Sequence, residues 1–305
     1  MCGIIAAASN RNVGKLLVQG LHKMEYRGYD SAGIALHQKD QVAHLRTLGK
    51  VKLLEEKMIQ EKPKSKLGIA HTRWATHGEP SEENAHPHKS NERVYIVHNG
   101  IIENYLDLKD FLKKEGYSFA SQTDSELIAH MLDYFLNQGN SMLDSMYLTK
   151  DRLDGAYAIA AIDLEDDQNI IIARSKSPLL IGIGIDELLA ASDPLALGQL
   201  TNEFIFLEDG DVAELSSDSY LIYDINKQKV EREISKIDIS SQATSKGEYK
   251  HFMEKEIYEQ PEAILNTIDG RVGGDDILEN IFGLGSSEMF ERVKRIQIVA
   301  CGTSL

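Results

Sequence analysis

The alternation of apolar and polar residues divides the chain into a first part of mixed helices and strands and a later part of short strands. An unbroken apolar run over 2–8 predicts a buried strand. Apolar residues that recur every three or four positions predict amphipathic helices over 12–24 and 124–136. Further strands are expected over 32–37, 41–48, 67–71 and 93–98.

From 156 to 224 the pattern changes to short apolar runs between turn residues. The expected strands are 156–162, 170–173, 179–183, 203–207, 212–215 and 220–223. Asp209-Gly210-Asp211 is typical of a hairpin turn. Strands this dense, without helices between them, indicate antiparallel sheets. We therefore expect stacked sheets covered by the helices of the earlier part.

The polar, small-residue stretch 240–247 is typical of a linker and separates two domains, 1–239 and 240–305. After it, 251–268 is expected to be helical, with a break or a new helical start at Pro261. A buried strand is expected over 296–300.

Composition favours a globular protein whose partners are neither nucleic acids nor membranes. The chain has 305 residues, 42% of them hydrophobic, and a net charge of −15 from 48 acidic and 33 basic side chains. No block of Lys and Arg stands out, which argues against binding to nucleic acid or anionic membrane surfaces.

The cysteines and the N-terminus favour the cytoplasm. The two cysteines, Cys2 and Cys301, lie far apart and give no disulfide framework. The chain shows no signal-peptide pattern, and no stretch approaches the roughly 18 apolar residues that a membrane span needs. We therefore expect a cytoplasmic protein, in a compartment that keeps thiols reduced.

The first candidate for chemistry is Cys2, which follows the initiator methionine directly. Methionine is usually removed before so small a residue, which would leave a thiol and a free α-amine on Cys2. An unperturbed α-amine has a pKa of about 7.7–8.0 and an unperturbed thiol one of about 8.5. Both groups can exchange protons near neutral pH, as activation of a nucleophile requires. Taken alone, however, a cysteine here is more often an ordinary small residue.

The segment 25–35 and the loop 71–88 are both rich in polar residues. In the first, Gly28 permits a tight turn and Arg27 offers a planar guanidinium, although a helix end before a strand fits equally well. In the second, Arg73 suits a carboxylate partner. Trp74, the only tryptophan, fits a lid or, more commonly, a core anchor. Four of the ten histidines lie in this loop, His71, His77, His86 and His88. They lack a recognised ligand spacing, so we expect no metal.

Two shorter motifs each allow two interpretations. In His98-Asn99-Gly100 a side-chain amide lies beside a flexible backbone N–H, as an oxyanion site requires, but Asn-Gly is also the strongest short turn signal. In 122–126, Thr123 or Asp124 fits the N-cap of the following helix, and a carboxylate there could also hold a ligand ammonium.

Together these motifs resemble one family, the isomerizing glutamine–fructose-6-phosphate aminotransferases, or glucosamine-6-phosphate synthases. The resemblance covers the whole chain in order and spacing. It rests on the Cys2-Gly3-Ile4 start and on RGYDSAGIA (27–35), HTRWATHG (71–78), NAHPH (84–88), HNG (98–100) and TDSE (123–126). The wider class is the class II glutamine amidotransferases, which are N-terminal-nucleophile hydrolases.

The fold implied by the resemblance is α+β, a four-layer αββα sandwich of two antiparallel sheets over 1–239. In 240–305 the resemblance implies a linker and the beginning of an α/β sugar-isomerase domain. There Gly302, Thr303 and Ser304 are similar to a sugar-phosphate loop, which is incomplete because no helix follows it in this sequence.

The resemblance also implies a role for each motif residue. Cys2 would be the nucleophile and its α-amine the general base, with Asn99 and the Gly100 backbone N–H as the oxyanion hole. Arg27 and Trp74 would orient the loop and gate the passage of ammonia. The residues expected to bind glutamine are Arg73, Thr76, His77 and Asp124.

The activity implied is that of a glutaminase half, which releases glutamate and ammonia. In the complete enzyme, a homodimer without a cofactor, the ammonia would convert fructose-6-phosphate to glucosamine-6-phosphate. Because the family continues past the phosphate loop, we expect these residues alone to hydrolyse glutamine without making the amino sugar. Two alternatives remain: another class II amidotransferase, such as an amidophosphoribosyltransferase, or a catalytically silent regulatory module.

Overall fold

The computed structural model describes residues 2–75, 77–237, 249–268, 272–273, 276–277, 286–295 and 297. The chain forms two compact units, Met1–Ser245 and Lys246–Leu305. The predicted linker lies outside the described residues, as do Gly302, Thr303 and Ser304. The two-domain boundary and the sugar-phosphate loop therefore stay predictions.

The first sheet contains eight strands in the described part of the chain. They are β1 (Gly3–Ser9), β2 (Ser31–Gln38), β3 (Gln41–Leu48), β4 (Leu67–Arg73), β9 (Leu180–Gly184), β10 (Glu187–Ala191), β11 (Glu203–Phe206) and β15 (Ile234–Lys236). Their order is β15-β11-β9-β10-β1-β4-β2-β3, and neighbouring strands are antiparallel. Strand β1, which follows Cys2, therefore lies inside the sheet, between β10 and β4.

The second sheet contains seven strands within the described residues. They are β5 (His88–Ser90), β6 (Val94–Ile102), β7 (Gly155–Asp163), β8 (Ile170–Ser175), β12 (Val212–Leu215), β13 (Tyr220–Tyr223) and β14 (Lys229–Val230). Their order is β14-β13-β12-β8-β7-β6-β5, again with antiparallel neighbours. The long β6–β7 pair carries the His98-Asn99-Gly100 motif.

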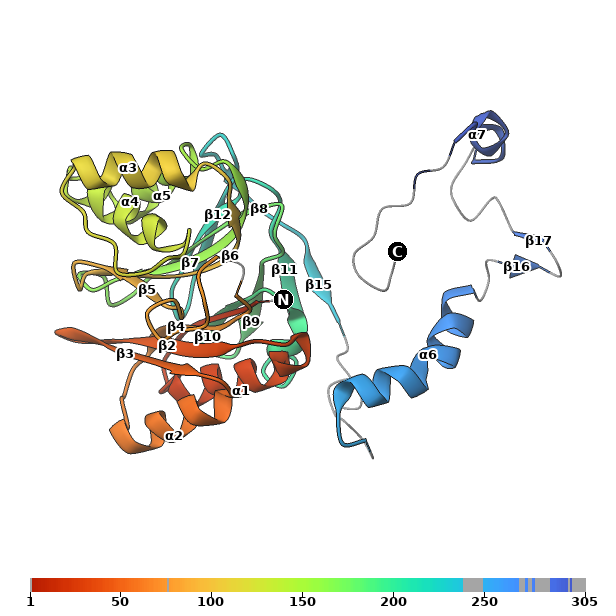
Figure 1. The fold of residues 1–305 in the computed structure, drawn as a ribbon, viewed down its shortest axis with the longest axis horizontal. Helices are drawn as coiled ribbons and strands as arrows, with labels where there is room; N and C mark the ends of the chain where they lie inside the picture. The colour runs from red at the N-terminus through yellow and green to blue at the C-terminus, as the bar shows by residue number, and fades with distance from the viewer. Residues whose placement is uncertain are drawn as a thin grey trace. The chain divides into compact units, whose positions relative to one another are not determined.

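Helices cover the outer face of each sheet, which gives four layers (Figure 1). The first unit contains α1 (Gly14–Met24), α2 (Val51–Glu61), α3 (Tyr105–Lys114), α4 (Glu126–Leu136) and α5 (Met142–Lys150), with the short 3₁₀ turns η1 (Glu25–Arg27) and η2 (Pro194–Ala196). Helices α1 and α2 pack on the first sheet, and α3, α4 and α5 on the second. The predicted four-layer αββα sandwich is confirmed.

The layers follow from the two-residue period of the strands, which sends alternate side chains to opposite faces. In β1, Ile4, Ala6 and Ala8 pack between the two sheets, whereas Ile5 and Ala7 pack against the helices. The inter-sheet core combines alanines with Ile, Leu and Val. Because β1 is buried on both faces, its sequence is continuously apolar, as the initial run predicted.

Three local predictions are wrong. Asn99-Gly100 is no turn, because β6 continues to Ile102 in register with β7. Asp209-Gly210-Asp211 makes no hairpin, because β11 and β12, which it connects, belong to different sheets. Pro261 does not break its helix, because one missing N–H interrupts a single hydrogen bond and the helix continues on both sides.

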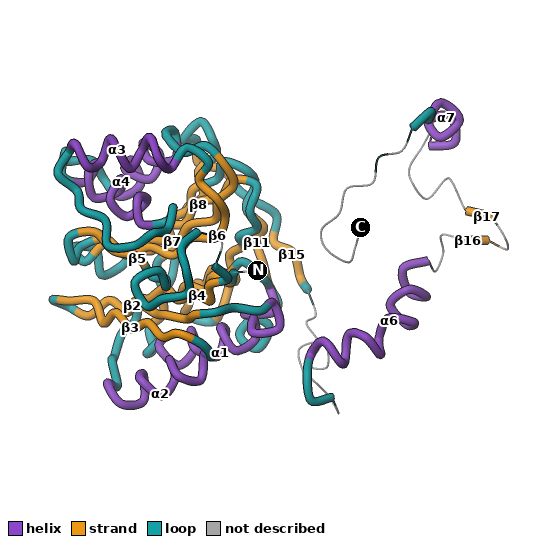
Figure 2. The backbone as a smooth tube through the Cα atoms, viewed as in Figure 1, coloured by secondary structure: helices purple, strands orange, loops and turns teal. Residues whose placement is uncertain are grey.

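The helices of the second unit are purple and its strands orange in Figure 2. It contains α6 (Phe252–Ile268), the short strands β16 (Val272–Gly273) and β17 (Asp276–Ile277), and α7 (Ser286–Arg292). The strand predicted over 296–300 lies almost wholly outside the described residues. Among the helices that the structure describes, none is both long and apolar enough to cross a membrane.

Candidate active site

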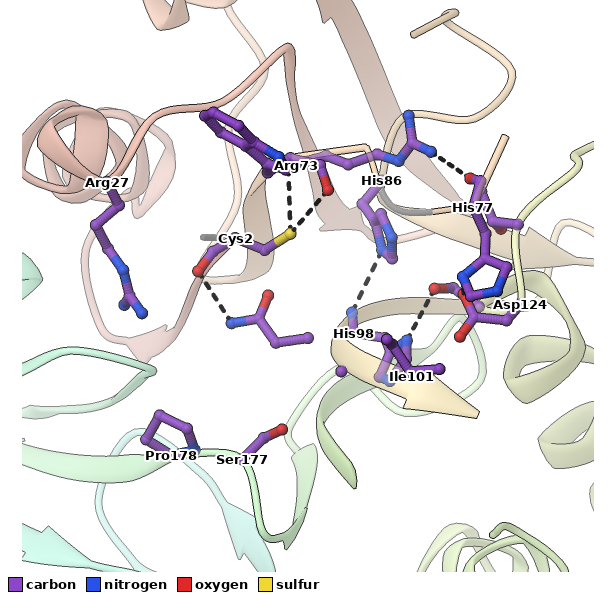
Figure 3. A pocket seen from close by; sticks show the side chains of 15 residues that line it. Cys2, Arg27, Arg73, His77, His86, His98, Ile101, Asp124, Ser177 and Pro178 are labelled. Atoms are coloured by element: carbon purple, nitrogen blue, oxygen red, sulfur yellow. Dashed lines mark hydrogen bonds and ion pairs between the residues drawn. The ribbon is translucent and has the colours of Figure 1, made fainter. Parts of the chain in front are cut away.

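The described residues of the predicted glutamine site line one pocket of about 480 Å³. Its volume falls within the roughly 300–1,000 Å³ typical of small-molecule sites. Figure 3 shows side chains from both sheets and from the connecting loops pointing into it. The predicted residues that line it are Cys2, Arg27, Arg73, Trp74, His77, Asn99, Gly100 and Asp124. Thr76, the remaining one, lies outside the described residues.

The Cys2 thiol lies at the start of β1, against the backbone of Trp74. Its Sγ accepts a hydrogen bond from the Trp74 N–H at 3.2 Å and lies 3.5 Å from the Trp74 carbonyl oxygen, to which the thiol can donate (Figure 3). Burial raises the pKa of the thiol, and the Trp74 N–H and the charge of Arg73 offset only part of this rise. At neutral pH the sulfur is therefore protonated and needs a base.

Among the described residues, the hydrogen-bond partners of Cys2 Sγ are the backbone N–H and carbonyl oxygen of Trp74. No described side chain that could act as a base is hydrogen-bonded to this sulfur. Burial also lowers the pKa of the nearby His86 and His98, but neither donates to or accepts from Sγ. The α-amine of Cys2 as the proton acceptor therefore stays a prediction from the sequence.

The Asn99 side chain faces Cys2 from the other sheet. Its Nδ2 donates to the Cys2 carbonyl oxygen at 3.3 Å, and its Oδ1 lies 2.9 Å from Nε2 of His71. The amide therefore presents its N–H groups toward the residue that carries the nucleophile, as an oxyanion donor must.

Gly100 meets a strict steric requirement beside Asn99. Its φ is +132°, and a Cβ placed on it would lie 1.9 Å from the carbonyl oxygen of Ala156 on β7. A side chain here would thus break the β6–β7 pairing. The sequence Asn-Gly is explained by this close approach of two strands, not by a turn.

Arg73, at the end of β4, is tied to the loop that follows it. Its Nη2 donates to the His77 and Gly78 carbonyl oxygens at 2.5 and 3.0 Å, and its Nη1 lies 3.6 Å from a carboxylate oxygen of Asp30. The side chain is buried, so this network fixes the guanidinium at the pocket wall. A guanidinium held in this way beside the pocket suits recognition of a carboxylate.

Asp124 lies opposite, next to His77 (Figure 3). Its Oδ2 accepts a hydrogen bond from the Ile102 N–H at 2.8 Å, and its Oδ1 lies 4.0 Å from His77 Nδ1. The alternative N-cap role for Thr123 or Asp124 is wrong, because α4 has Ser125 at that position, without a side-chain cap. Asp124 instead presents a buried carboxylate to the pocket.

Arg27 and Trp74 lie at the rim. Arg27 pairs with Asp193 at 3.5 Å. Trp74 is 53% exposed, which contradicts the common fate of a core anchor. Its ring packs against Gly28, where a Cβ would come within 2.4 Å of it and where φ is +76°. A glycine is thus required beneath the indole, which explains how the 25–35 segment and the 71–88 loop fit together.

Sequence reasoning assigned no role to three residues that help to form the site. Asp30 pairs with Arg73 and accepts a hydrogen bond from the Ala75 N–H. His71 contacts Asn99, and Ser177 lines the pocket. His71 and Asp30 lie in motifs that the resemblance rests on, but their partners are 28 and 43 or more positions away, so only the fold reveals these contacts.

Comparisons with known proteins show which proteins this chain resembles. The family described as "Glutamine amidotransferase domain" matches residues 71–199. Glutamine–fructose-6-phosphate aminotransferase (isomerizing) of Vibrio parahaemolyticus is 47% identical over 305 residues, and that of Haemophilus influenzae 48% over 306. Both matches cover 100% of this chain and 50% of the relative, so the chain spans about half the length of the curated relatives it matches.

Solved structures share the fold at lower identity. Glutamine phosphoribosylpyrophosphate amidotransferase from B. subtilis matches with a TM-score of 0.61 at 24% identity, over 77% of this chain and 49% of that one. A glutamine aminotransferase class-II domain protein from Silicibacter pomeroyi matches with a TM-score of 0.51 at 15% identity, over 73% and 99%. The whole chain thus matches the N-terminal half of the glutamine–fructose-6-phosphate aminotransferases, and its fold is that of the class II glutamine amidotransferases.

Proposed function

We propose that the first unit hydrolyses glutamine, with Cys2 as the nucleophile. One observation carries the proposal: the thiol and the donor end of the Asn99 amide meet in one pocket, with Asn99 Nδ2 3.3 Å from the Cys2 carbonyl oxygen. Arg73 and Asp124 line the same pocket with opposite charges. Such a pair suits the α-carboxylate and the α-ammonium of an amino acid.

In the first half-reaction, Sγ of Cys2 attacks the side-chain amide carbon of glutamine while the thiol proton passes to the α-amine of Cys2. The amide oxygen becomes an oxyanion, which Asn99 Nδ2 and the Gly100 N–H stabilise. The α-ammonium then protonates the amide nitrogen, the C–N bond breaks, and ammonia leaves. The product is a thioester between Cys2 and the glutamyl group.

In the second half-reaction, water attacks the thioester carbon and gives a proton to the α-amine. The same oxyanion site stabilises the second tetrahedral intermediate. The C–S bond breaks, glutamate leaves, and the proton returns to the sulfur. The net reaction converts one glutamine and one water into one glutamate and one ammonia.

For the longer protein we propose that the ammonia aminates fructose-6-phosphate. The support is the name shared by the relatives, glutamine–fructose-6-phosphate aminotransferase (isomerizing), and their match over the whole of this chain. Arg27 and Trp74 at the rim of the pocket fit the orienting and gating roles that the motifs predict.

The test is release of glutamate and ammonia from glutamine by the purified chain. Wild type should give the two products in equal amounts, and Cys2→Ala should give neither while it melts at the same temperature. Cys301→Ala is the matched control, because it removes the other thiol and should keep the wild-type rate.

The alternative of a silent regulatory module makes the opposite prediction. A wild-type chain that binds glutamine but releases no glutamate would support that alternative. If Cys2→Ala kept a tenth of the wild-type rate, the assignment of the nucleophile would be wrong.

A further inference from the structure

Asn99 can act as an oxyanion donor only in one orientation of its amide. Rotation of the amide by 180° exchanges Nδ2 and Oδ1, which have nearly the same shape and opposite hydrogen-bonding character. In the flipped state a carbonyl oxygen would face the developing negative charge. Something in the protein must therefore select between the two orientations.

Asn99 Oδ1 is hydrogen-bonded to His71, whose Nε2 lies 2.9 Å away. His71 belongs to β4 in the first sheet and Asn99 to β6 in the second, so this contact joins the two sheets behind the pocket. His71 itself does not line the pocket. Its hydrogen bond to Asn99 therefore connects it to the pocket indirectly.

The protonation state of His71 determines whether its Nε2 can donate a hydrogen bond to Asn99 Oδ1. The imidazole is fully buried, and burial lowers its pKa to about 3, against smaller opposing effects of Asn99 and of the His98 backbone. It is neutral at physiological pH and carries a single N–H. Because Asn99 Nδ2 donates to the Cys2 carbonyl oxygen, its Oδ1 faces Nε2 of His71. An amide oxygen can only accept, so this contact requires the His71 proton on Nε2.

The ring of His71 is also held in place from behind. The His86 imidazole stacks on it with the ring centroids 4.1 Å apart and the planes tilted by 32°. His86 is fixed in turn, because its Nδ1 accepts a hydrogen bond from the His98 N–H at 3.3 Å. The donor that faces Asn99 is therefore rigid, which suits a group that must fix the direction of another.

We propose that His71 is a positioning residue that holds the Asn99 amide with Nδ2 toward the oxyanion, by donating from Nε2 to Oδ1. The proposal rests on the proposed glutaminase function and adds to it the residue that orients the oxyanion hole. It assigns a use to a fully buried histidine that never touches the substrate.

The kinetic test compares His71→Gln with His71→Leu in glutamine hydrolysis. Glutamine can place an amide N–H near the position of Nε2, whereas leucine fills similar volume without a donor. We expect His71→Leu to lower kcat roughly 10- to 100-fold with little change in KM, since loss of a whole oxyanion donor costs about 10²–10³. His71→Gln should recover most of the rate.

Two further measurements separate positioning from general damage. In an Asn99→Ala background, His71→Leu should cause no further loss, because the group on which it acts is gone. Alkylation of Cys2 by iodoacetamide displaces iodide and forms no oxyanion, so His71→Leu should alkylate at the wild-type rate. Additive losses, or a slowed alkylation, would overturn the proposal.

A third measurement does not depend on catalysis. In wild-type protein labelled with ¹⁵N at histidine, long-range ¹H–¹⁵N spectra should show the His71 proton on Nε2, the signal being the one lost in His71→Gln. A proton on Nδ1 would refute the proposal. If wild type released no glutamate, the proposed function would fail, and this spectrum would still decide the orientation of the His71–Asn99 contact.

Discussion

Acidification from pH 8 to pH 5 should destabilise the first unit through its buried histidines. Burial lowers the pKa of His44 to about 4 and that of His71 to about 3. It also lowers the pKa values of His86, His88 and His98. In the unfolded chain each pKa returns to about 6.5. Below pH 6.5 these histidines bind protons in the unfolded state but not in the folded state, so the free energy of unfolding decreases as the pH falls. Above pH 6.5 they are neutral in both states, and the effect vanishes.

The loss of unfolding free energy follows from the pH range over which these histidines are protonated only in the unfolded state. Between pH 6.5 and pH 5 each histidine whose folded pKa lies below 5 costs about 1.5 × 1.36, or about 2 kcal/mol. His44 and His71 together give about 4 kcal/mol, a large part of the 5–15 kcal/mol of a whole domain, and His86, His88 and His98 act in the same direction. His22 acts in the opposite sense, because its hydrogen bond to Glu25 raises its pKa, but it is partly exposed and solvent weakens its effect. Unfolded carboxylates titrate near pH 4, below this window.

The assay is urea denaturation followed by circular dichroism at steps from pH 8 to pH 5. The slope of the unfolding free energy against pH gives the number of protons taken up on unfolding. We expect several protons per molecule near pH 5.5 and none above pH 7.5. His44→Gln is the matched control, because it removes one partly buried imidazole outside the pocket and should lower the uptake by about one. An uptake below one proton in wild type would refute the reasoning.

Three further outcomes are expected. Asn99→Ala should lower the glutaminase kcat by about 10²–10³ with a modest effect on KM, and a normal kcat in the folded fraction would reduce Asn99 to a purely structural role. Gly100→Ala should lower the melting temperature as well as the activity, because its Cβ would lie 1.9 Å from the Ala156 carbonyl oxygen; an unchanged melting curve would contradict the steric argument. Intact mass of active protein should show loss of Met1, and full activity with Met1 retained would exclude the α-amine of Cys2 as the base.

The sequence predicted the layers of the fold because each rests on a local period. The two-residue alternation in β1 and the helical spacing in α1 and α4 are properties of single segments, and all three elements lie close to where they were expected. The strand β10 (Glu187–Ala191) was missed, since its short apolar run follows a strand of the same kind with only a two-residue turn between them.

The site was harder to predict, because its chemistry depends on contacts between distant segments. The motif around Asn99 favoured a turn locally, and only its pairing with β7 keeps it in a strand. The sequence favoured a core position for Trp74, whereas in the structure its ring is exposed and packs on Gly28. The glutamine site as a whole was predicted through resemblance, whereas the roles of Asp30 and His71 required the fold.

The place of β1 in the middle of the first sheet has a practical consequence for anyone who prepares this protein. Most N-termini lie loosely at a surface, where an affinity tag does no harm. Here the residue that precedes a fully buried strand lines the pocket, so any peptide added before Cys2 would extend from the site itself. If the α-amine of Cys2 is the base, as we propose, removal of the initiator methionine by the host's methionine aminopeptidase switches the enzyme on. Differences in specific activity between preparations would then measure incomplete processing and not misfolding.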